Sequence, residues 1–510
     1  MVYPSPKTEG GFCLKRKMFL SVLVVLVLTL SLVPTSAFAA GVECPAGEAC
    51  TDHTAAIGDV HYDSLKEAIA AANDGEKIVL LKSVTENSVT FSKPGTYTLD
   101  LNGNTLTSDK PGSDIIGLHT ADLTLTIENG TLATEDPTTY GIYAYHKGGT
   151  EGYDNLNLKL EKVIINSIDQ PLGVQGLNAN QNVTVKDSVI TCQTTGIYFP
   201  PYSGVLTIDN SQITALDNAV VVKGGTVIVK GEKTLLKATG VPEEQDKPYD
   251  GNTAGKGFPQ TGSALYVEGG YKAAGNAGER PIDVVLQDGV FQSEHAAAVA
   301  VNYIADPQVQ TTQVQGGVYS SDVLQFVSAQ SVSATVTSAS GDKLYYIGDT
   351  AAVSARISNA AVSGDSIEVL SGDVELTINK DDVTVVNSGS GKVVADGHEV
   401  GTDPYETHAH VLEIVGAKEA TCIQEGYTGD KMCTICSQVM EKGQVLPKLA
   451  HNYQDGKCTV CGAEDPNYQP DDSQSPSTGD GSLLALWMAL LFISGSGAFV
   501  ANALTRKKNG

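Results

Sequence analysis

Two Cys-x-x-Cys motifs near the C-terminal end of the chain have the residue types and the spacing of a metal site. They are Cys433–Cys436 and Cys458–Cys461, in the segment 405–468. Four thiolates can surround one tetrahedral Zn²⁺ ion. One prediction is therefore a zinc-ribbon-like module in which these four cysteines hold a structural zinc ion.

Further cysteine and histidine residues beside these motifs leave the ligand set open. A second grouping takes Cys422, one histidine and the first Cys-x-x-Cys motif, and leaves the second motif to His451 and another ligand; His410 is the other nearby histidine. Disulfides are a competing interpretation if the chain is exported, because the exterior is oxidising. In either case we expect a structural cross-link, since so small a module with few large apolar residues needs one.

The two ends of the chain carry export and anchoring signals. A basic segment, an apolar run and a small-residue site predict a signal peptide over 1–39. Cys44 and Cys50 follow it closely, and we expect them to form a disulfide-closed loop. At the other end, an apolar run over 482–505 is long enough to span a bilayer and is followed by a basic tail, 506–510.

A short motif, Ser475-Pro476-Ser477-Thr478-Gly479, stands directly before this apolar run, within a linker over 469–481. In this order and place it resembles the cell-wall sorting signal of Gram-positive bacteria, with a serine where leucine is usual. The resemblance implies that a sortase attacks the threonine carbonyl, cuts the bond to glycine and joins the chain to peptidoglycan after a transient membrane insertion. The expected location is the cell-wall surface.

Composition and charge limit the partners. The 510 residues have a formal net charge of −26 and include 53 glycines and a single tryptophan. Removal of the two terminal segments, which are net +3 and +2, leaves about −31. Such a surface repels nucleic acid and anionic polymers, so we expect neither as a partner.

The middle of the chain repeats one short pattern. In each copy an apolar–polar–apolar triplet leads to a small or polar corner, and another apolar residue follows seven or eight positions after the start. Copies of this length cannot bury their apolar faces alone, and stacking them forms a continuous core. The copies begin at Leu99, Leu125, Leu158, Val183, Leu206, Val227, Val284 and Thr312, and their late apolar residues are Leu106, Leu132, Ile165, Ile190, Ile213, Leu235, Phe291 and Tyr319.

These repeats, with the opening Leu99–Leu106, resemble the right-handed parallel β-helix proteins of the pectate-lyase-like superfamily. We therefore expect a mainly β chain: a capping helix within 40–94, a β-helix over 95–343, and the Cys-rich module. A short helix and strand pattern returns over 344–404, which predicts either a small β unit or the C-terminal cap of the solenoid.

Function is harder to read from the repeats. Tyr143, Tyr198 and Tyr266 occupy one expected outward position and form a possible ligand platform. Recurring acids such as Asp187, Asp209 and Asp288 are the candidates for glycoside hydrolysis, although turn residues have the same composition. No catalytic motif of the resembling family is present. We expect a non-enzymatic adhesin that binds a polysaccharide or a host surface glycoprotein; the alternative is a carbohydrate-active enzyme on a neutral polysaccharide.

Overall fold

The computed structural model describes residues 53–144, 154–174, 180–242, 262–269, 280–302 and 310–469. The chain divides into two compact units, 1–409 and 410–510. The predicted signal peptide, Cys44 and Cys50, the sorting motif and the apolar run all lie outside the described residues. The described part of the chain contains no helix that is long and apolar enough to span a bilayer.

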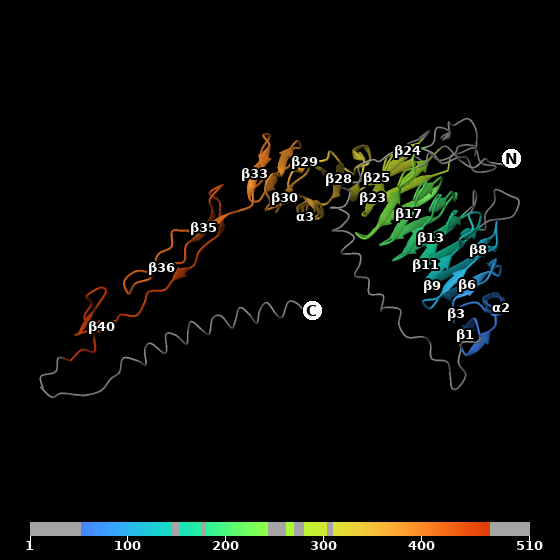
Figure 1. Ribbon diagram of the computed structural model, residues 1–510, viewed down its shortest axis with the longest axis horizontal. Coiled ribbons are helices and arrows are strands. Elements are labelled where there is room, and N and C mark those ends of the chain that lie inside the picture. The colour runs from blue at the N-terminus through green and yellow to red at the C-terminus, as the bar shows by residue number, and fades with distance from the viewer. Residues whose placement is uncertain are drawn as a thin grey trace, which may run out of the picture. The chain divides into compact units, whose positions relative to one another are not determined.

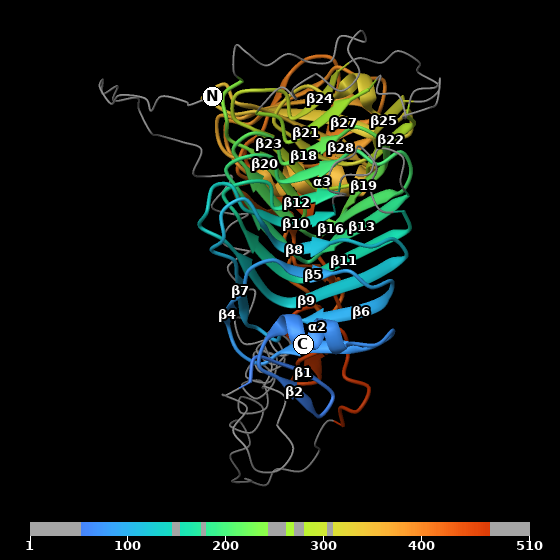
Figure 2. The ribbon, with the colours of Figure 1, turned by 90° about the vertical axis from the view of Figure 1, so that its right-hand side faces the viewer.

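The N-terminal unit is a solenoid of parallel β-strands, which confirms the mainly β, parallel-sheet architecture (Figures 1 and 2). Each coil passes through three strands, here called faces 1, 2 and 3, and each strand pairs in parallel with its counterpart in the next coil. Face 1 consists of β3 (Lys77–Leu80), β6 (Gly95–Asp100), the first halves of β9 (Leu123–Ala133) and β11 (Leu156–Asn166), β13 (Gln181–Lys186), β16 (Val205–Asp209), β19 (Gly225–Lys230), β22 (Ile282–Leu286) and β25 (Gln310–Val314).

The other two faces run alongside face 1. Face 2 consists of β4 (Val84–Thr85), β7 (Thr105–Thr107), the second halves of β9 and β11, β14 (Val189–Thr191), β17 (Gln212–Ala215), β20 (Leu235–Ala238), β23 (Val290–Ser293) and β26 (Gly317–Tyr319). Face 3 consists of β5 (Val89–Phe91), β8 (Asp114–Leu118), β10 (Tyr140–Ala144), β12 (Leu172–Val174), β15 (Ile197–Phe199), β18 (Val220–Val222), β21 (Leu265–Glu268) and β24 (Val299–Asn302).

The alternation of apolar and polar residues explains this stack. In β9, Leu123, Leu125 and Ile127 are fully buried and the residues between them are partly exposed. The corner from face 1 to face 2 then needs a left-handed residue, and Asn129 takes it with φ of 57°. Glycine, asparagine and aspartate tolerate this conformation best, and Asp187, Asn210 and Gly231 take it in later coils, whereas Lys162 takes it in the coil after Asn129.

The repeats align in register from Leu125 to Thr312. Two positions of the predicted pattern differ. Leu99 pairs with Ile127, so the first copy begins two residues earlier, at Tyr97. Ile213 pairs with Leu236 rather than Leu235, because the corner of that coil is longer and shifts which leucine faces the core.

A short helix covers the N-terminal end of the solenoid. Helix α2 (Leu65–Ala71) follows the hairpin of β1 (Ala55–Ile57) and β2 (Val60–Tyr62), and the Ser64 side chain accepts a hydrogen bond from the Glu67 amide at its N-terminus. Leu65, Ala68 and Ile69 are buried in the solenoid core. The expected capping helix is therefore present.

The same arrangement recurs after the last coil. The hairpin of β27 (Val332–Thr337) and β28 (Lys343–Gly348) precedes helix α3 (Thr350–Ala360) and β29 (Ser366–Ser371), as β1 and β2 precede α2 and β3. Strand β28 pairs with β26 of the last coil, yet this segment has its own apolar core. This segment thus closes the solenoid and begins a second, shorter stack. The 3₁₀ helix η1 (Leu324–Phe326) precedes β27, and the strands after β29 are β30 (Val374–Leu376), β31 (Thr384–Asn387), β32 (Val393–Ala395), β33 (His398–Val400) and β34 (Tyr405–Glu406).

The strands described within the C-terminal unit form short antiparallel pairings. Strand β37 (Asp430–Cys433) lies between β35 (Leu412–Val415) and β38 (Val439–Glu441). Two further pairs are β36 (Gly426–Tyr427) with β39 (Val445–Leu446), and β40 (Tyr453–Gln454) with β41 (Lys457–Cys458). These strands position the cysteine motifs.

Candidate metal centres and a candidate binding face

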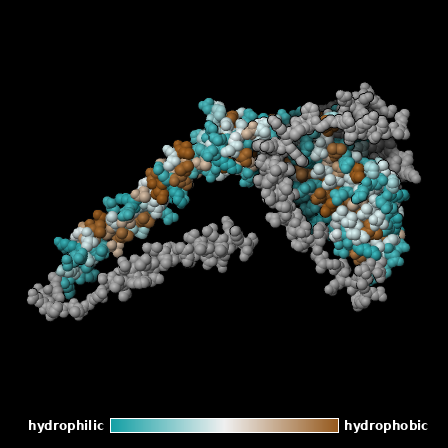
Figure 3. Space-filling model, in the orientation of Figure 1, coloured by the Kyte–Doolittle hydropathy of each residue, from teal (hydrophilic) through white to brown (hydrophobic). Residues whose placement is uncertain are grey.

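The described part of the C-terminal unit, 410–469, has almost no apolar core. Among its described residues, the buried members of the hydrophobic class are three cysteines, Cys422, Cys433 and Cys458. Figure 3 shows brown patches on the surface of the part that carries β35 and β36. The exposed large apolar side chains of the unit include Val411, Leu412, Ile414, Ile423, Ile435, Val445, Leu449 and Val460. The interior of this unit is therefore built from thiols.

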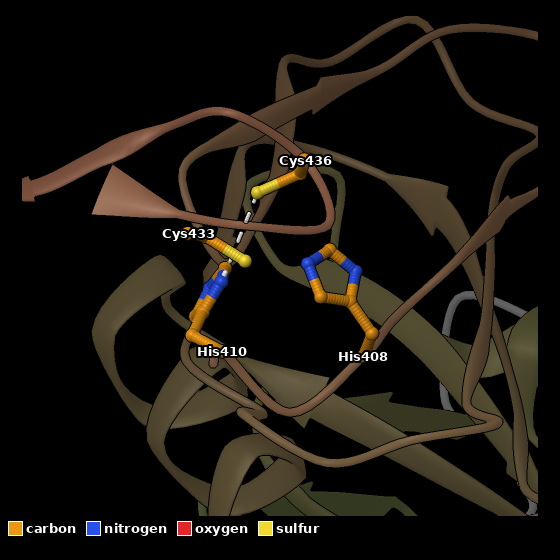
Figure 4. A group of neighbouring side chains, drawn as sticks. All are labelled: His408, His410, Cys433 and Cys436. Atoms are coloured by element: carbon orange, nitrogen blue, oxygen red, sulfur yellow. Dashed lines mark hydrogen bonds between the residues drawn. The ribbon is translucent and has the colours of Figure 1, made fainter. Parts of the chain in front are cut away.

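The cysteines and histidines form two groups. In the first, His408, His410, Cys433 and Cys436 place one ligand atom each within 4.8 Å of all the others. Figure 4 shows the side chains of this group gathered around a common space, with the Cys436 Sγ atom 3.8 Å from Nδ1 of His410. His408 is only two positions from His410, so the chain itself holds it close.

The second group lies wholly within the C-terminal unit. It contains Cys422, His451, Cys458 and Cys461, again with all ligand atoms within 4.8 Å of one another. The Sγ atoms of Cys422 and Cys458 are 3.6 Å apart, and Sγ of Cys461 lies 3.3 Å from Nδ1 of His451. None of the six cysteines within the described residues is in a disulfide.

These spacings suit tetrahedral zinc. With zinc–sulfur and zinc–nitrogen bonds of about 2.3 and 2.0–2.1 Å, two ligands at a tetrahedral edge are about 3.8 Å apart for sulfur–sulfur and about 3.6 Å apart for sulfur–nitrogen. The three measured distances, 3.6, 3.8 and 3.3 Å, lie close to these values. Both groups can hold a metal ion.

The two Cys-x-x-Cys motifs have the same local backbone. In each, the amide that follows the second cysteine donates to the carbonyl of the first: Ser437 to Cys433, and Gly462 to Cys458, both at 2.9 Å. The Ile435 amide also donates to the Cys433 sulfur, at 3.4 Å. Amide donors around a sulfur stabilise the thiolate that a metal needs.

The second group shows this effect in the pKa values of its thiols. Backbone amides of Cys461 and Val460 donate to Cys458 and lower its pKa to about 5. Burial and the neighbouring thiols raise the pKa of Cys422 to about 11. Because metal ligation needs both sulfurs as thiolates, binding of a metal by this pair releases a proton from the thiol with the higher pKa.

The sequence predicted either one ion shared by the two Cys-x-x-Cys motifs or a site that joins Cys422 to the first motif. The structure places the two motifs in separate groups, with Cys422 beside the second motif. His408 was missed, although the His408-x-His410 spacing beside a cysteine motif was a usable signal. Spacing alone does not say which motif a distant ligand joins, because that depends on the path of the intervening chain.

The predicted tyrosines do align, on face 3. Their column reads Gly117, Tyr143, Gly173, Tyr198, Val221, Tyr266 and Ala300 in successive coils. The residues beside them, such as Ile142, Ile197 and Leu265, belong to the solenoid core, whereas the tyrosines do not. The column therefore lies on the outer side of face 3.

Two of the three tyrosines are not open to solvent. Tyr143 is 9% exposed and Tyr266 is 1% exposed, while Tyr198 is partly exposed. The ring of Tyr143 lies over Gly173, where a Cβ atom would come within 2.5 Å of it. An open stacking platform of three rings is thus not what the structure shows, and Tyr198 is the accessible member.

Ionisable side chains accompany both ends of the column. At one end, Asp114 and His119 flank Gly117, with the Asp114 Oδ2 atom 3.9 Å from Nε2 of His119, and Tyr140 stacks on Tyr143 with ring centroids 4.7 Å apart. Burial raises the pKa of Asp114 to about 6 and lowers the pKa of His119. No sequence motif marks this group; the alternation of glycine and tyrosine in the column was the only signal.

At the other end, buried charges lie beside Tyr198 and Tyr266. Lys223 and Glu268 form an ion pair at 3.0 Å with side chains 6% and 0% exposed. The Lys223 ammonium lies 5.6 Å from the centre of the Tyr198 ring. Burial lowers the pKa of Lys223 and raises that of Tyr198 to about 12.

The acids that the sequence suggested for hydrolysis occupy turns and ion pairs. Asp187 has a left-handed backbone with φ of 49°. Asp209 lies 3.5 Å from the Lys230 ammonium, and Asp288 pairs with Arg356 at 2.5 Å. These contacts explain the three acids as structural residues.

Comparison of the chain with models of known protein families, with curated proteins and with solved structures finds no significant match.

Proposed function

We propose that this chain is a surface protein of a Gram-positive cell wall whose solenoid, a right-handed parallel β-helix, binds an extended glycan along the outer side of face 3. The observation that carries the proposal is the partly exposed ring of Tyr198 on this side, with ionisable groups at both ends of its column. The column from Tyr143 to Tyr266 spans four coil steps, or about 19 Å at about 4.8 Å for each step. Such a length suits a polymer, either a polysaccharide or the glycan of a host surface glycoprotein.

The terminal segments support the location. The expected signal peptide, the motif Ser475–Gly479, the apolar run and the basic tail together favour export, membrane insertion, and transfer of Thr478 to peptidoglycan by a sortase. The C-terminal unit would then be a structural zinc module close to the anchored end of the chain. Its two groups of thiols and imidazoles are the support for zinc.

A glycan array tests the binding proposal. Residues 40–478, which retain every described residue, are applied to an array of neutral and charged polysaccharides and to immobilised host glycoproteins. Binding to at least one extended glycan, weakened by Tyr198→Ala, is the expected result. Tyr468→Ala is the matched control, because Tyr468 is an exposed tyrosine of the C-terminal unit. Absence of binding to every surface would contradict the proposal.

A second function, glycoside hydrolysis, is favoured by the acids beside Tyr140. Tyr140 pairs with Asp114 of the preceding coil, and Gly141 donates to Gln170 of the following one. The backbones of Asp114 and Asp169 therefore lie two coils apart, about 10 Å along the stack. Two carboxyl groups that face each other across such a gap would suit an inverting glycosidase, in which they are about 6.5–9.5 Å apart. Release of reducing sugar by wild type and not by Asp114→Asn would establish this function in place of simple binding.

A further inference from the structure

The ligands of the two metal groups alternate along the chain. His408 and His410 of the first group come first, then Cys422 of the second, and then Cys433 and Cys436 of the first. The remaining ligands of the second group follow; they are His451, Cys458 and Cys461.

Each group therefore closes a loop that contains a ligand of the other. The segment from His410 to Cys433 includes Cys422, and the segment from Cys422 to His451 includes the first Cys-x-x-Cys motif. A backbone hydrogen bond from Leu449 to Thr421, at 3.1 Å, holds the Cys422 turn beside the approach to His451. Two successive, independent metal knuckles would show neither feature.

We propose that the segment 408–461 binds two zinc ions through these interleaved ligand sets, and that each ion holds in place a segment that the other ion needs. The inference rests on the proposed structural role of zinc and adds the number of ions, their ligands and their mutual dependence. The first site has two thiolates and two imidazoles, and the second has three thiolates and one imidazole.

The mutual dependence follows from how little else orders this unit. Its apolar side chains are exposed, and its strands are two to four residues long. In small domains without a core, the free energy of metal binding is also free energy of folding. Loss of one ion then releases a loop that carries a ligand of the other, and the second ion binds more weakly.

Native mass spectrometry of residues 40–478, purified with reductant and Zn²⁺, counts the ions. Two zinc ions per chain are expected in wild type and in Cys192→Ser, the matched control, because Cys192 is a buried thiol outside both groups. The double variant Cys433→Ser/Cys436→Ser is expected to keep at most one ion. Its remaining site, the second, should bind Zn²⁺ about tenfold or more weakly than the same site in wild type. Cys422→Ser is expected to weaken the first site in the same way.

Co²⁺ absorption of the wild-type protein distinguishes the alternative outcomes and does not depend on a variant that folds. The intensity of the sulfur-to-cobalt charge-transfer bands reports the number of bound thiolates. Bands of five thiolates and two ions support the inference. One ion per chain overturns it while a structural zinc role stands. No bound metal, with the cysteines in disulfides, overturns both. If two ions bind but the affinity of each site is unchanged in the variant that lacks the other site, the mutual dependence is refuted.

Discussion

Two neighbouring isoleucines in β11 allow a direct test of which side of the coil faces the core. Ile165 is fully buried and pairs with Leu132 and Ile190 of the adjacent coils, both also fully buried. Ile164, the preceding residue, points to the other side and is 36% exposed. The perturbation is replacement of each by alanine, which removes the same atoms from opposite sides of one strand.

The expected losses of unfolding free energy differ because only the substitution at Ile165 leaves a cavity in the core. Loss of three carbon atoms from Ile165 costs about 2.4 kcal/mol at about 0.8 kcal/mol for each buried methylene group. The closely packed stack cannot collapse onto the space, so the cavity raises the total to about 3–4 kcal/mol. At Ile164 solvent fills the space, and we expect a loss of about 1 kcal/mol.

Urea unfolding of residues 40–478, followed by circular dichroism, measures both free energies of unfolding. The midpoint of the solenoid transition should fall for Ile165→Ala and change little for Ile164→Ala, with similar slopes against urea. Equal losses of unfolding free energy for the two variants, or a larger loss for Ile164→Ala, would mean that Ile165 is not the residue that packs in the core. Either result would refute the register of β11 described above.

Two further predictions concern single side chains. Burial raises the pKa of Asp114 from its ordinary value of 3.8 to about 6, so folding disfavours its charged form. This cost to stability is full above pH 6 and vanishes below about pH 4. Asp114→Asn should therefore raise the free energy of unfolding by about 1–2 kcal/mol at pH 7, a value reduced because the carboxyl group is partly exposed, and by almost nothing at about pH 3.5. A gain that is independent of pH would contradict this cause. At Gly130, an alanine Cβ would lie 2.4 Å from Cβ of Leu101 and 2.6 Å from the Asn104 carbonyl oxygen. Gly130→Ala should therefore destabilise the solenoid by about 1–3 kcal/mol in urea unfolding. An unchanged urea midpoint would contradict the close packing of this corner.

The solenoid could be predicted closely from the sequence because one simple rule repeats. Each coil alternates apolar and polar residues and turns at a small or polar corner, so the in-register residues from Leu125 to Thr312 were visible as a pattern. The errors at Leu99 and Leu235 arose where the first strand pairing and a longer corner shift the register by two residues or one. Periodicity cannot show such a shift, because apolar residues stand at both positions.

The candidate sites were less predictable because they depend on contacts between distant segments. Cys422 is 11 residues from Cys433 and 36 from Cys458, yet it lies beside Cys458, and only the path of the chain decides this. The tyrosine column was recognised from alignment of the coils, whereas the burial of Tyr143 and Tyr266 was not. At Tyr143 the burial depends on a contact between coils, since its ring lies over Gly173 of the next coil.

The measurement that most directly tests the proposed binding face is the affinity of residues 40–478 for the glycan that binds most strongly on the array, compared with that of Tyr198→Ala. Tyr198 is the accessible ring of the column and lies under the Lys223 ammonium. Loss of stacking by one aromatic ring should weaken binding about tenfold, while Tyr468→Ala leaves it unchanged. Equal affinity of wild type and Tyr198→Ala would contradict a binding site on the outer side of face 3.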